Sequence, residues 1–308
     1  MADIAHREKV RALDLDLRRR AAAVIPGGMY GHMTVGRLPD EYPQFYDRSE
    51  GAHVWDVDGN EYVDFMCSFG PMILGYRHTR VEAAAASQAA RGDTQPGPAP
   101  CMVELAELLV ERVAHADWAL FAKNGSDATT TSLMVARAET GRNKVLAAAG
   151  AYHGAAPWAT LRMDGVAPEE RANLHYYEYN DAASVERAID EAGADNVAAI
   201  ITSPFKHNAG FDQEDVDPAF ARRLRDEFDR LAEDVGVEIR QTGPVQMPNL
   251  SFPDDDEYTK ARAFSAVMLE RGVIVHPRHN WFLSTAHDDD DVDRFLEAAE
   301  AALHAVPA

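Results

Sequence analysis

The residues best suited to chemistry in this sequence form a glycine turn at 121–128, which reads FAKNGSDA. An apolar run at 119–122 leads into the turn and a helical pattern at 127–140 follows it, so the turn joins a predicted strand to a predicted helix. A helix N-terminus presents unpaired backbone N–H groups, and together with the Ser126 hydroxyl these groups would bind a phosphate. The alternative is a simple strand-to-helix turn that binds nothing.

A second candidate segment, 150–154 (GAYHG), directly follows an apolar run at 145–149 that we predict to be a strand. Ligands of α/β sheets bind at the carboxyl ends of the strands. Tyr152 is therefore a candidate for stacking on a flat cofactor ring. The alternative for the same side chain is an ordinary packed aromatic.

The elements that would position these residues alternate between strand and helix, which indicates a parallel sheet covered by helices. The predicted strands are 119–122, 145–149 and 197–202, and the predicted helices are 80–91, 101–115, 127–140, 183–192 and 217–235. Three strands are fewer than the about five to six of an average sheet.

The two ends of the chain predict a second region of mixed α and β structure. Residues 52–65 read as a hairpin that turns at 58–60 (DGN). The acidic residues 288–291 are read as a helix cap rather than a calcium site, because carboxylates at a helix N-terminus favour the helix dipole. The remaining predictions are helices at 7–24, 257–271 and 291–304 and strands at 237–240, 250–252, 273–276 and 282–284.

Composition disfavours several classes of function. The net charge of −21 argues against nucleic acids and anionic membranes as partners. Long apolar runs and a secretory signal are both missing, so we expect a cytoplasmic protein. Cys67 and Cys101 form no CxxC pair, and His276, His279 and His287 fit no standard zinc spacing, so we predict no metal site and set aside a metal-dependent hydrolase.

Several segments, occurring in the order of the family, resemble the class III pyridoxal-phosphate (PLP)-dependent aminotransferases, nearest to the glutamate-1-semialdehyde 2,1-aminomutase group. The resemblance spans nearly all of residues 25–303. The segments are 56–64 (DVDGNEYVD), 68–75 (SFGPMILG) with His78, the turn at 121–128, 150–154, 272–277 (GVIVHP) and 282–287 (FLSTAH).

The resemblance implies a PLP cofactor, a homodimer, and a small amino acid or semialdehyde as substrate. Residues 27–33 (GGMYGHM) depart from the aminomutase pattern, and Ser203 stands where the family commonly has glutamate, so the substrate stays open. By resemblance, Gly125 and Ser126 would hold the phosphate, Tyr152 would lie against the ring with His153 beside it, Asn208 would lie near the ring, and Gly28, Tyr30 and His32 would belong to the substrate-access loop.

The resemblance also implies two groups that this chain lacks, a carboxylate for the ring nitrogen and a lysine for the cofactor aldehyde. In the family both follow the segment that matches 197–210, whereas residues 217–235 here are polar and helical in pattern. We therefore predict an internal deletion near 222–230. Of the five lysines, Lys206 is a weak substitute, because it follows a predicted strand.

We expect an α/β protein like the fold type I PLP-dependent transferases, with a reduced parallel sheet in the large domain and an α+β small domain. The expected parts are an N-terminal segment 1–75 contributing to the small domain, an incomplete cofactor-binding domain 76–230, and a C-terminal small domain 231–308. The expected function is PLP-dependent amino-group transfer, impaired by the lost lysine. The alternatives are a non-catalytic partner of a full-length homologue, a working enzyme with a substitute lysine, and a shortened form of a normal enzyme.

Overall fold

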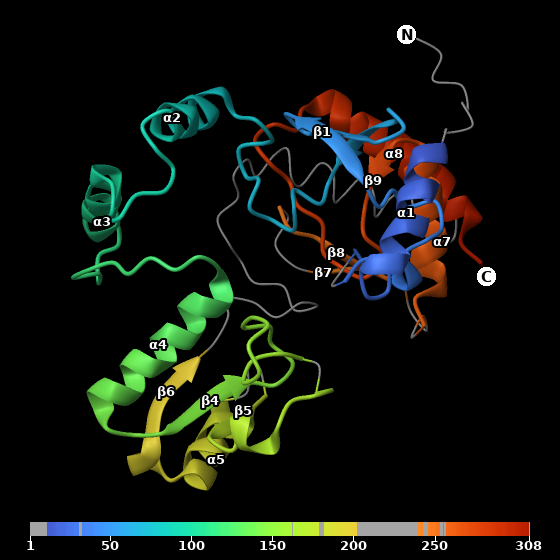
Figure 1. Cartoon of the computed structure of the whole chain (residues 1–308). Coiled ribbons are helices and arrows are strands. Elements are labelled where there is room, and N and C mark those ends of the chain that lie inside the picture. The colour runs from blue at the N-terminus through green and yellow to red at the C-terminus, as the bar shows by residue number, and fades with distance from the viewer. Residues whose placement is uncertain are drawn as a thin grey trace. The chain divides into compact units, whose positions relative to one another are not determined.

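The computed structural model describes residues 11–30, 33–161, 163–178, 182–201, 239–242, 246–252, 255 and 257–307. The chain divides into unit 1, made of Met1–Arg91 and His207–Ala308, and unit 2, made of Gly92–Lys206 (Figure 1). The predicted helix at 217–235 lies outside the described residues. Within the described part of the chain, every helix falls short of the length and apolar character that a membrane span requires.

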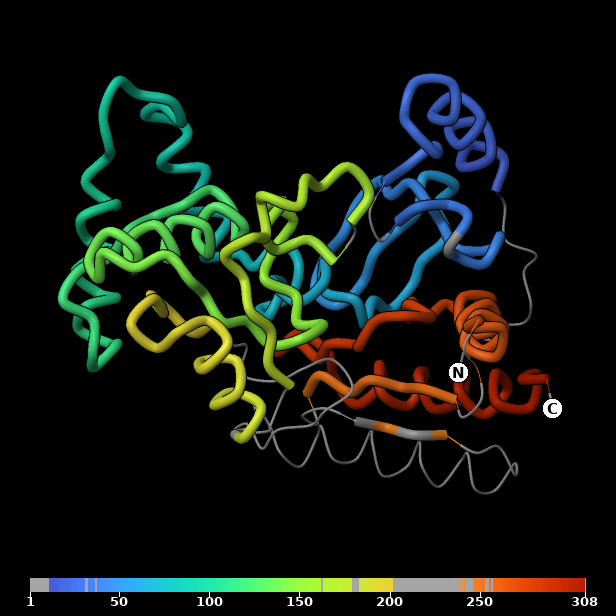
Figure 2. The backbone as a smooth tube through the Cα atoms, turned by 90° about the horizontal axis from the view of Figure 1, so that it is seen from below, coloured from blue at the N-terminus to red at the C-terminus, as the bar shows by residue number. Residues whose placement is uncertain are grey.

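Unit 1 contains a four-stranded sheet in the order β1-β2-β3-β9. The predicted hairpin is confirmed as β2 (His53–Asp56) and β3 (Glu61–Asp64), which pair antiparallel. Strand β1 (Tyr46–Glu50) was not predicted, because its sequence YDRSE is polar and largely exposed. The short β9 (Val273–Ile274) pairs parallel with β3, so segments from the two ends of the chain share one sheet (Figure 2).

The helices of unit 1 follow the predicted periodicity with shifted ends. They are α1 (Ala12–Val24), α2 (Thr79–Ala89), α7 (Thr259–Glu270) and α8 (Asp289–Ala305), with a short 3-10 turn at Val35–Arg37. The acidic run before α8 is confirmed as a cap, since the Asp288 side chain accepts a hydrogen bond from the Asp291 N–H at 3.0 Å. Strands β7 (Arg240–Thr242) and β8 (Asn249–Ser251) form a separate antiparallel pair.

Phe65, which directly follows β3, packs with Trp281 and with Phe295 of α8 in the core of unit 1. The Phe295 ring lies 4.9 Å from that of Phe65 and 5.2 Å from that of Trp281. Burial of each such ring stabilises the fold by about 1.5–3 kcal/mol. The prediction of a strand at 282–284 is wrong. The Phe282 N–H donates to Phe65 and the Leu283 N–H donates to Gln246, so neighbouring residues bond to different segments and no ladder forms.

An ion pair joins the sheet of unit 1 to the first turn of α8. The Nε2 atom of His53 lies 3.3 Å from an Asp291 carboxylate oxygen, and its Nδ1 lies 2.9 Å from Glu61, where the angle makes no hydrogen bond. The bond to Asp291 raises the pKa of His53 despite partial burial. A histidine whose folded pKa is raised contributes stability below its unfolded pKa and loses it as pH rises through the folded value.

We therefore expect unit 1 to become less stable as pH rises from about 6.5, the unfolded pKa of histidine, to about 8. Urea unfolding followed by circular dichroism at both pH values measures the loss. His53→Gln should flatten this dependence, and a slope unchanged in that variant would contradict the assignment. His287 does not confuse the test, because burial lowers its pKa and places its titration below this window.

Unit 2 contains a three-stranded parallel sheet in the order β5-β4-β6. Its strands are β4 (Lys144–Ala148), β5 (Leu174–Tyr177) and β6 (Val197–Ile201). The strand predicted at 119–122 is wrong, because these residues form an irregular segment with no strand partner among the described residues. Strand β5 takes a place in the sheet beside β4, although its sequence LHYY shows no period-two pattern.

The helices of unit 2 are α3 (Pro100–Arg112), α4 (Gly125–Thr140) and α5 (Ala182–Ala192), with 3-10 turns at Pro168–Arg171 and Ala194–Asn196. A small core of Leu146, Ala148 and Tyr177 from the sheet packs against Ala188 and Ala192 of α5. Helix α3 was predicted to be amphipathic, yet most of its long apolar side chains are exposed in the structure, namely those of Met102, Val103, Leu105, Leu108 and Leu109.

Candidate cofactor site

The predicted phosphate turn lies at the start of α4, which begins two residues earlier than expected. Asn124 is the N-cap, and its side chain accepts a hydrogen bond from the Asp127 N–H at 2.9 Å. Gly125 and Ser126 therefore lie in the first turn of the helix, where backbone N–H groups have no partner within the helix. With the positive end of the helix dipole, these groups form a site suited to an anion.

Segment 150–154 contacts this first turn directly. The Ser126 hydroxyl oxygen accepts a hydrogen bond from the Ala155 N–H at 2.9 Å, and the Thr129 hydroxyl donates to the His153 carbonyl at 2.8 Å. Gly154 is buried against Ser126 so closely that a Cβ on it would lie 2.6 Å from the serine oxygen. Two segments that the sequence singled out separately are thus brought together at the carboxyl end of β4.

His153 has one ring nitrogen without a partner. Its ring stacks on Trp158 at 6.5 Å between centroids, and its Nε2 is buried with no hydrogen-bond partner among the described residues. Burial lowers the pKa of His153, so its imidazole is neutral near pH 7. A buried, unpaired ring nitrogen is an observation in favour of a polar ligand here.

A cavity of about 320 Å³ lies beside His153. It is lined by residues that follow β4 and by Trp158, Thr160 and Tyr176, but not by Ser126 or Tyr152. The Tyr152 side chain is 57% exposed, so a face of its ring is available for stacking. The first turn of α4 offers hydrogen-bond donors that fit the phosphate of a cofactor such as PLP, and Tyr152 offers an aromatic face that fits its ring.

Neither lysine of unit 2 within the described residues is placed to take the cofactor aldehyde. The Lys144 Nζ donates to the Ala172 carbonyl at 3.1 Å, at the amino end of β4 and therefore away from segment 150–154. Lys123 is exposed and immediately precedes the N-cap, where its charge would favour a phosphate. Lys206 and Asn208 lie outside the described residues.

The other predicted site residues belong to unit 1 or lie outside the described residues. Gly28 and Tyr30 belong to unit 1, where Tyr30 is 75% exposed, and His32 lies outside the described residues. His276 and His287 are buried and accept hydrogen bonds from neighbouring N–H groups. No group of three potential metal ligands occurs in the part of the chain that the structure describes.

Two residues of this site were missed from the sequence. Thr129 binds the His153 carbonyl, and the Trp158 indole N–H donates to Thr130 at 2.9 Å while its ring stacks on His153. Thr129 follows Ser126 by three residues, so both lie on one face of α4, and this spacing could have identified Thr129 from the sequence. Trp158 lies in an irregular segment and offered no such signal.

The sequence of this chain is similar to known aminotransferases. The family profile "Aminotransferase class-III" matches residues 35–232. The aminopentol aminotransferase of Sphingopyxis macrogoltabida is 37% identical over 396 residues, covering 94% of each chain. The glutamate-1-semialdehyde 2,1-aminomutase of Chloroflexus aggregans is 37% identical over 203 residues, which is 62% of this chain and 46% of that protein.

Solved structures agree with these sequence matches. The FumI protein of Sphingopyxis sp., in its PLP internal aldimine form, superposes with a TM-score of 0.87 at 35% identity and covers 94% of this chain and 95% of its own. An omega-transaminase from Sphaerobacter thermophilus, at 20% identity, covers 95% of this chain and 97% of its own with a TM-score of 0.79, which supports the fold. The predicted fold type I class is thereby confirmed. The chain belongs to the class III aminotransferases, a family of PLP-dependent proteins.

Proposed function

We propose that this chain binds PLP through the first turn of α4 and segment 150–154. We also propose that amino-group transfer is impaired, because neither lysine of unit 2 within the described residues is placed for the cofactor aldehyde. The contact of Ser126 with Gly154 and Ala155 carries this proposal, since it closes the anion-binding end of α4 against the segment that bears Tyr152 and His153. When bound, PLP supplies an aldehyde and an electron-withdrawing ring for chemistry at an amine-bearing carbon.

The roles of the residues follow from their contacts. Because the Ser126 oxygen already accepts from Ala155, its proton is free to donate to a phosphate oxygen, beside the N–H groups of Gly125 and Ser126. Tyr152 would lie against the ring, and the unpaired Nε2 of neutral His153 would bind a polar group of the cofactor. We place Asn208 near the ring, and Gly28, Tyr30 and His32 in the substrate-access loop, as part of the same proposal.

An internal deletion is proposed as the cause of the impairment. The alignment with aminopentol aminotransferase spans 396 residues, at least 88 more than the 308 of this chain, so that many aligned positions have no residue here. This supports the loss of the segment that carries the lysine and the carboxylate for the ring nitrogen. By family, the ligands would be an amino acid, a semialdehyde or an aminopentol, and the protein a cytoplasmic homodimer.

Borohydride trapping tests the proposal. After incubation with PLP, reduction fixes any lysine joined to the cofactor, and intact-mass and peptide analysis locate it. We expect saturable PLP binding that inorganic phosphate competes away. We also expect that no lysine is labelled stoichiometrically, at one PLP per chain, and that no amino group is transferred from amine donors. Stoichiometric labelling of Lys206, lost in Lys206→Ala and retained in Lys260→Ala, together with amino transfer, would overturn it.

A non-catalytic partner of a full-length homologue is the second candidate. It is favoured by α3, whose long apolar side chains are exposed in unit 2, with Val103 at 58% and Leu105 at 46%. Light scattering after size-exclusion chromatography, with the chain alone and mixed with a full-length class III aminotransferase, measures the association. A mixed dimer that Val103→Asp abolishes would support the candidate, and separate elution of the two proteins would remove it.

A further inference from the structure

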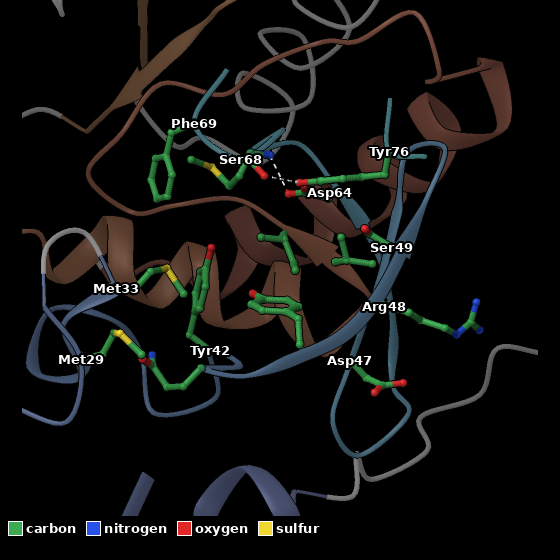
Figure 3. A pocket seen from close by; sticks show the side chains of 15 residues that line it. Met29, Met33, Tyr42, Asp47, Arg48, Ser49, Asp64, Ser68, Phe69 and Tyr76 are labelled. Carbon is green, nitrogen blue, oxygen red and sulfur yellow. Dashed lines mark hydrogen bonds between the residues drawn. The ribbon is translucent and has the colours of Figure 1, made fainter. Parts of the chain in front are cut away.

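Both units of the chain contain a cavity. The cavity of unit 1, of about 470 Å³, has Met29 and Met33 on its wall, beside the residues that we place in the substrate-access loop (Figure 3). It therefore belongs to the site already proposed. The cavity of unit 2, of about 320 Å³, is lined in part by a charged side chain to which the proposed function gives no role, that of Arg171.

The half-buried Arg171 side chain donates hydrogen bonds to three uncharged oxygens. Its Nε donates to the Pro157 carbonyl at 3.2 Å, its Nη2 donates to the Thr160 carbonyl, and its Nη1 donates to the Tyr176 hydroxyl at 3.3 Å. Hydrogen bonds from a charged donor are roughly twice as strong as neutral ones. The planar guanidinium also fixes the geometry of its acceptors, which a lysine ammonium does not. Arg171 is therefore suited to hold the backbone at 157 and 160.

The two carbonyls that Arg171 binds belong to a tight turn at 156–160. The N–H groups of Ala159 and Thr160 both donate to the Ala156 carbonyl at 2.8 Å. The carbonyls lie on either side of Trp158 in the sequence, so the guanidinium spans the residue from both sides. The direction in which the Trp158 side chain leaves the backbone thus depends on Arg171.

The Trp158 ring lies on the imidazole of His153. The ring centroids are 6.5 Å apart and the ring planes differ by 14°. The indole N–H donates to the Thr130 hydroxyl of α4 at 2.9 Å, and the adjacent Thr129 hydroxyl donates to the His153 carbonyl at 2.8 Å. His153 is therefore held at its backbone by α4 and covered at its ring by Trp158.

Arg171 is itself anchored next to the sheet. It ends the 3-10 turn at Pro168–Arg171, whose start is fixed by a hydrogen bond of 3.1 Å from the Ala167 N–H to the Glu170 carboxylate. Strand β5 begins three residues later and pairs with β4, and its Tyr176 binds the guanidinium. Arg171 thus connects the edge of the sheet to the turn that carries Trp158.

We propose that Arg171 is a positioning residue of the cofactor site, which holds the turn at 156–160 so that Trp158 stacks on His153 and fixes its imidazole. The inference rests on the proposed function only in naming PLP as the ligand, because the contacts among Arg171, Trp158 and His153 lie within the protein itself.

Titration of His153 by imidazole NMR tests this role without PLP, with the signal assigned by its loss in His153→Gln. Burial lowers the pKa of His153 below its ordinary value of 6.5. Arg171→Met frees the turn and lets water reach the ring, so the pKa should rise toward 6.5. Trp158→Leu should raise it too, without removing a charge. The double variant should raise it no further, because Arg171 acts through Trp158.

Arg142→Met is the matched control. The Arg142 Nη1 also donates to a backbone carbonyl, that of Val197 at 3.1 Å, but Arg142 precedes the amino end of β4 and so lies away from segment 150–154. This variant should change neither the His153 pKa nor the affinity for PLP. Equilibrium dialysis should show that Arg171→Met weakens PLP binding about three- to tenfold, the loss expected for roughly one hydrogen bond.

Three results would refute the role of Arg171: a His153 pKa unchanged in Arg171→Met, additive rises in the double variant, or PLP binding that Arg171→Met leaves as tight as in the wild-type chain. Circular dichroism establishes that each variant is folded. If Arg171→Met does not fold, Arg171→Lys keeps the charge but cannot hold both carbonyls, and the same rise in pKa is expected. A wild-type chain that binds no PLP would reject the proposed function, and the His153 titration would still decide whether Arg171 positions the ring.

Discussion

Replacing Gly154 by alanine is expected to lower the affinity for PLP by at least about tenfold and the free energy of unfolding of unit 2 by about 2–4 kcal/mol. The added Cβ would lie 2.6 Å from the Ser126 hydroxyl oxygen and 3.0 Å from the Ser126 Cα, and the φ of +122° is itself unfavourable for alanine. Ser126 must therefore move, and the first turn of α4, which we propose to bind the cofactor phosphate, moves with it.

Equilibrium dialysis of PLP and urea unfolding measure the two effects of Gly154→Ala. Gly165→Ala is the matched control, because Gly165 also has a positive φ of +79° but nothing within 4 Å of its added Cβ. In the control, the free energy of unfolding should fall only by the cost of placing alanine at a positive φ, and the affinity for PLP should not change. Equal affinities in the two variants would show that the Ser126 contact does not shape the site.

Replacing Gly75 by alanine is expected to lower the free energy of unfolding of unit 1 by about 3–5 kcal/mol. The new Cβ would lie 2.4 Å from the Ala286 Cβ and 2.9 Å from the Gly51 carbonyl oxygen, and the φ of Gly75 is +77°. Neither neighbour can rotate away, because one is a methyl group and the other is backbone. The adjacent bridge, in which Gly51 and Tyr76 exchange hydrogen bonds at 2.8 Å and 3.0 Å, would be strained as well.

Urea unfolding of a double variant separates the clash in Gly75→Ala from the backbone penalty. Ala286→Gly removes the nearest atom, so adding it to Gly75→Ala should restore part of the lost stability. Gly59→Ala, at a φ of +84° with nothing within 4 Å, should cost only about 1–2 kcal/mol. If Gly75→Ala lowers the free energy of unfolding no more than Gly59→Ala does, close packing against Ala286 is not the reason that position 75 requires glycine.

The elements that were predicted correctly carry their signals within a few residues. The hairpin of β2 and β3 follows from alternation around Asp58-Gly59-Asn60, and α8 from the acidic cap at Asp288. Helix α4 was expected to end before Gly141, and it does, with Gly141 in the left-handed conformation. Such signals depend on backbone geometry and local hydrogen bonds, which do not require the rest of the fold.

The errors arose where pairing partners decide the structure. The apolar run at 119–122 forms no strand, whereas the irregular sequence LHYY of β5 does, because it finds a place beside β4. Residues 282–284 divide their hydrogen bonds between Phe65 and Gln246. A segment forms a strand only where a neighbouring strand supplies hydrogen-bond partners for its backbone, and the local sequence does not predict which segment that neighbour will be.

The sequence by itself determined the family, the glycine turn at the start of a helix and the small number of lysines, because these are patterns of residue type and spacing. Only the tertiary structure decided that Gly154 presses against Ser126, that β3 pairs with β9 across the length of the chain, and that Arg171 binds the turn at 156–160. These features join residues distant in sequence, and their distances depend on how whole elements pack.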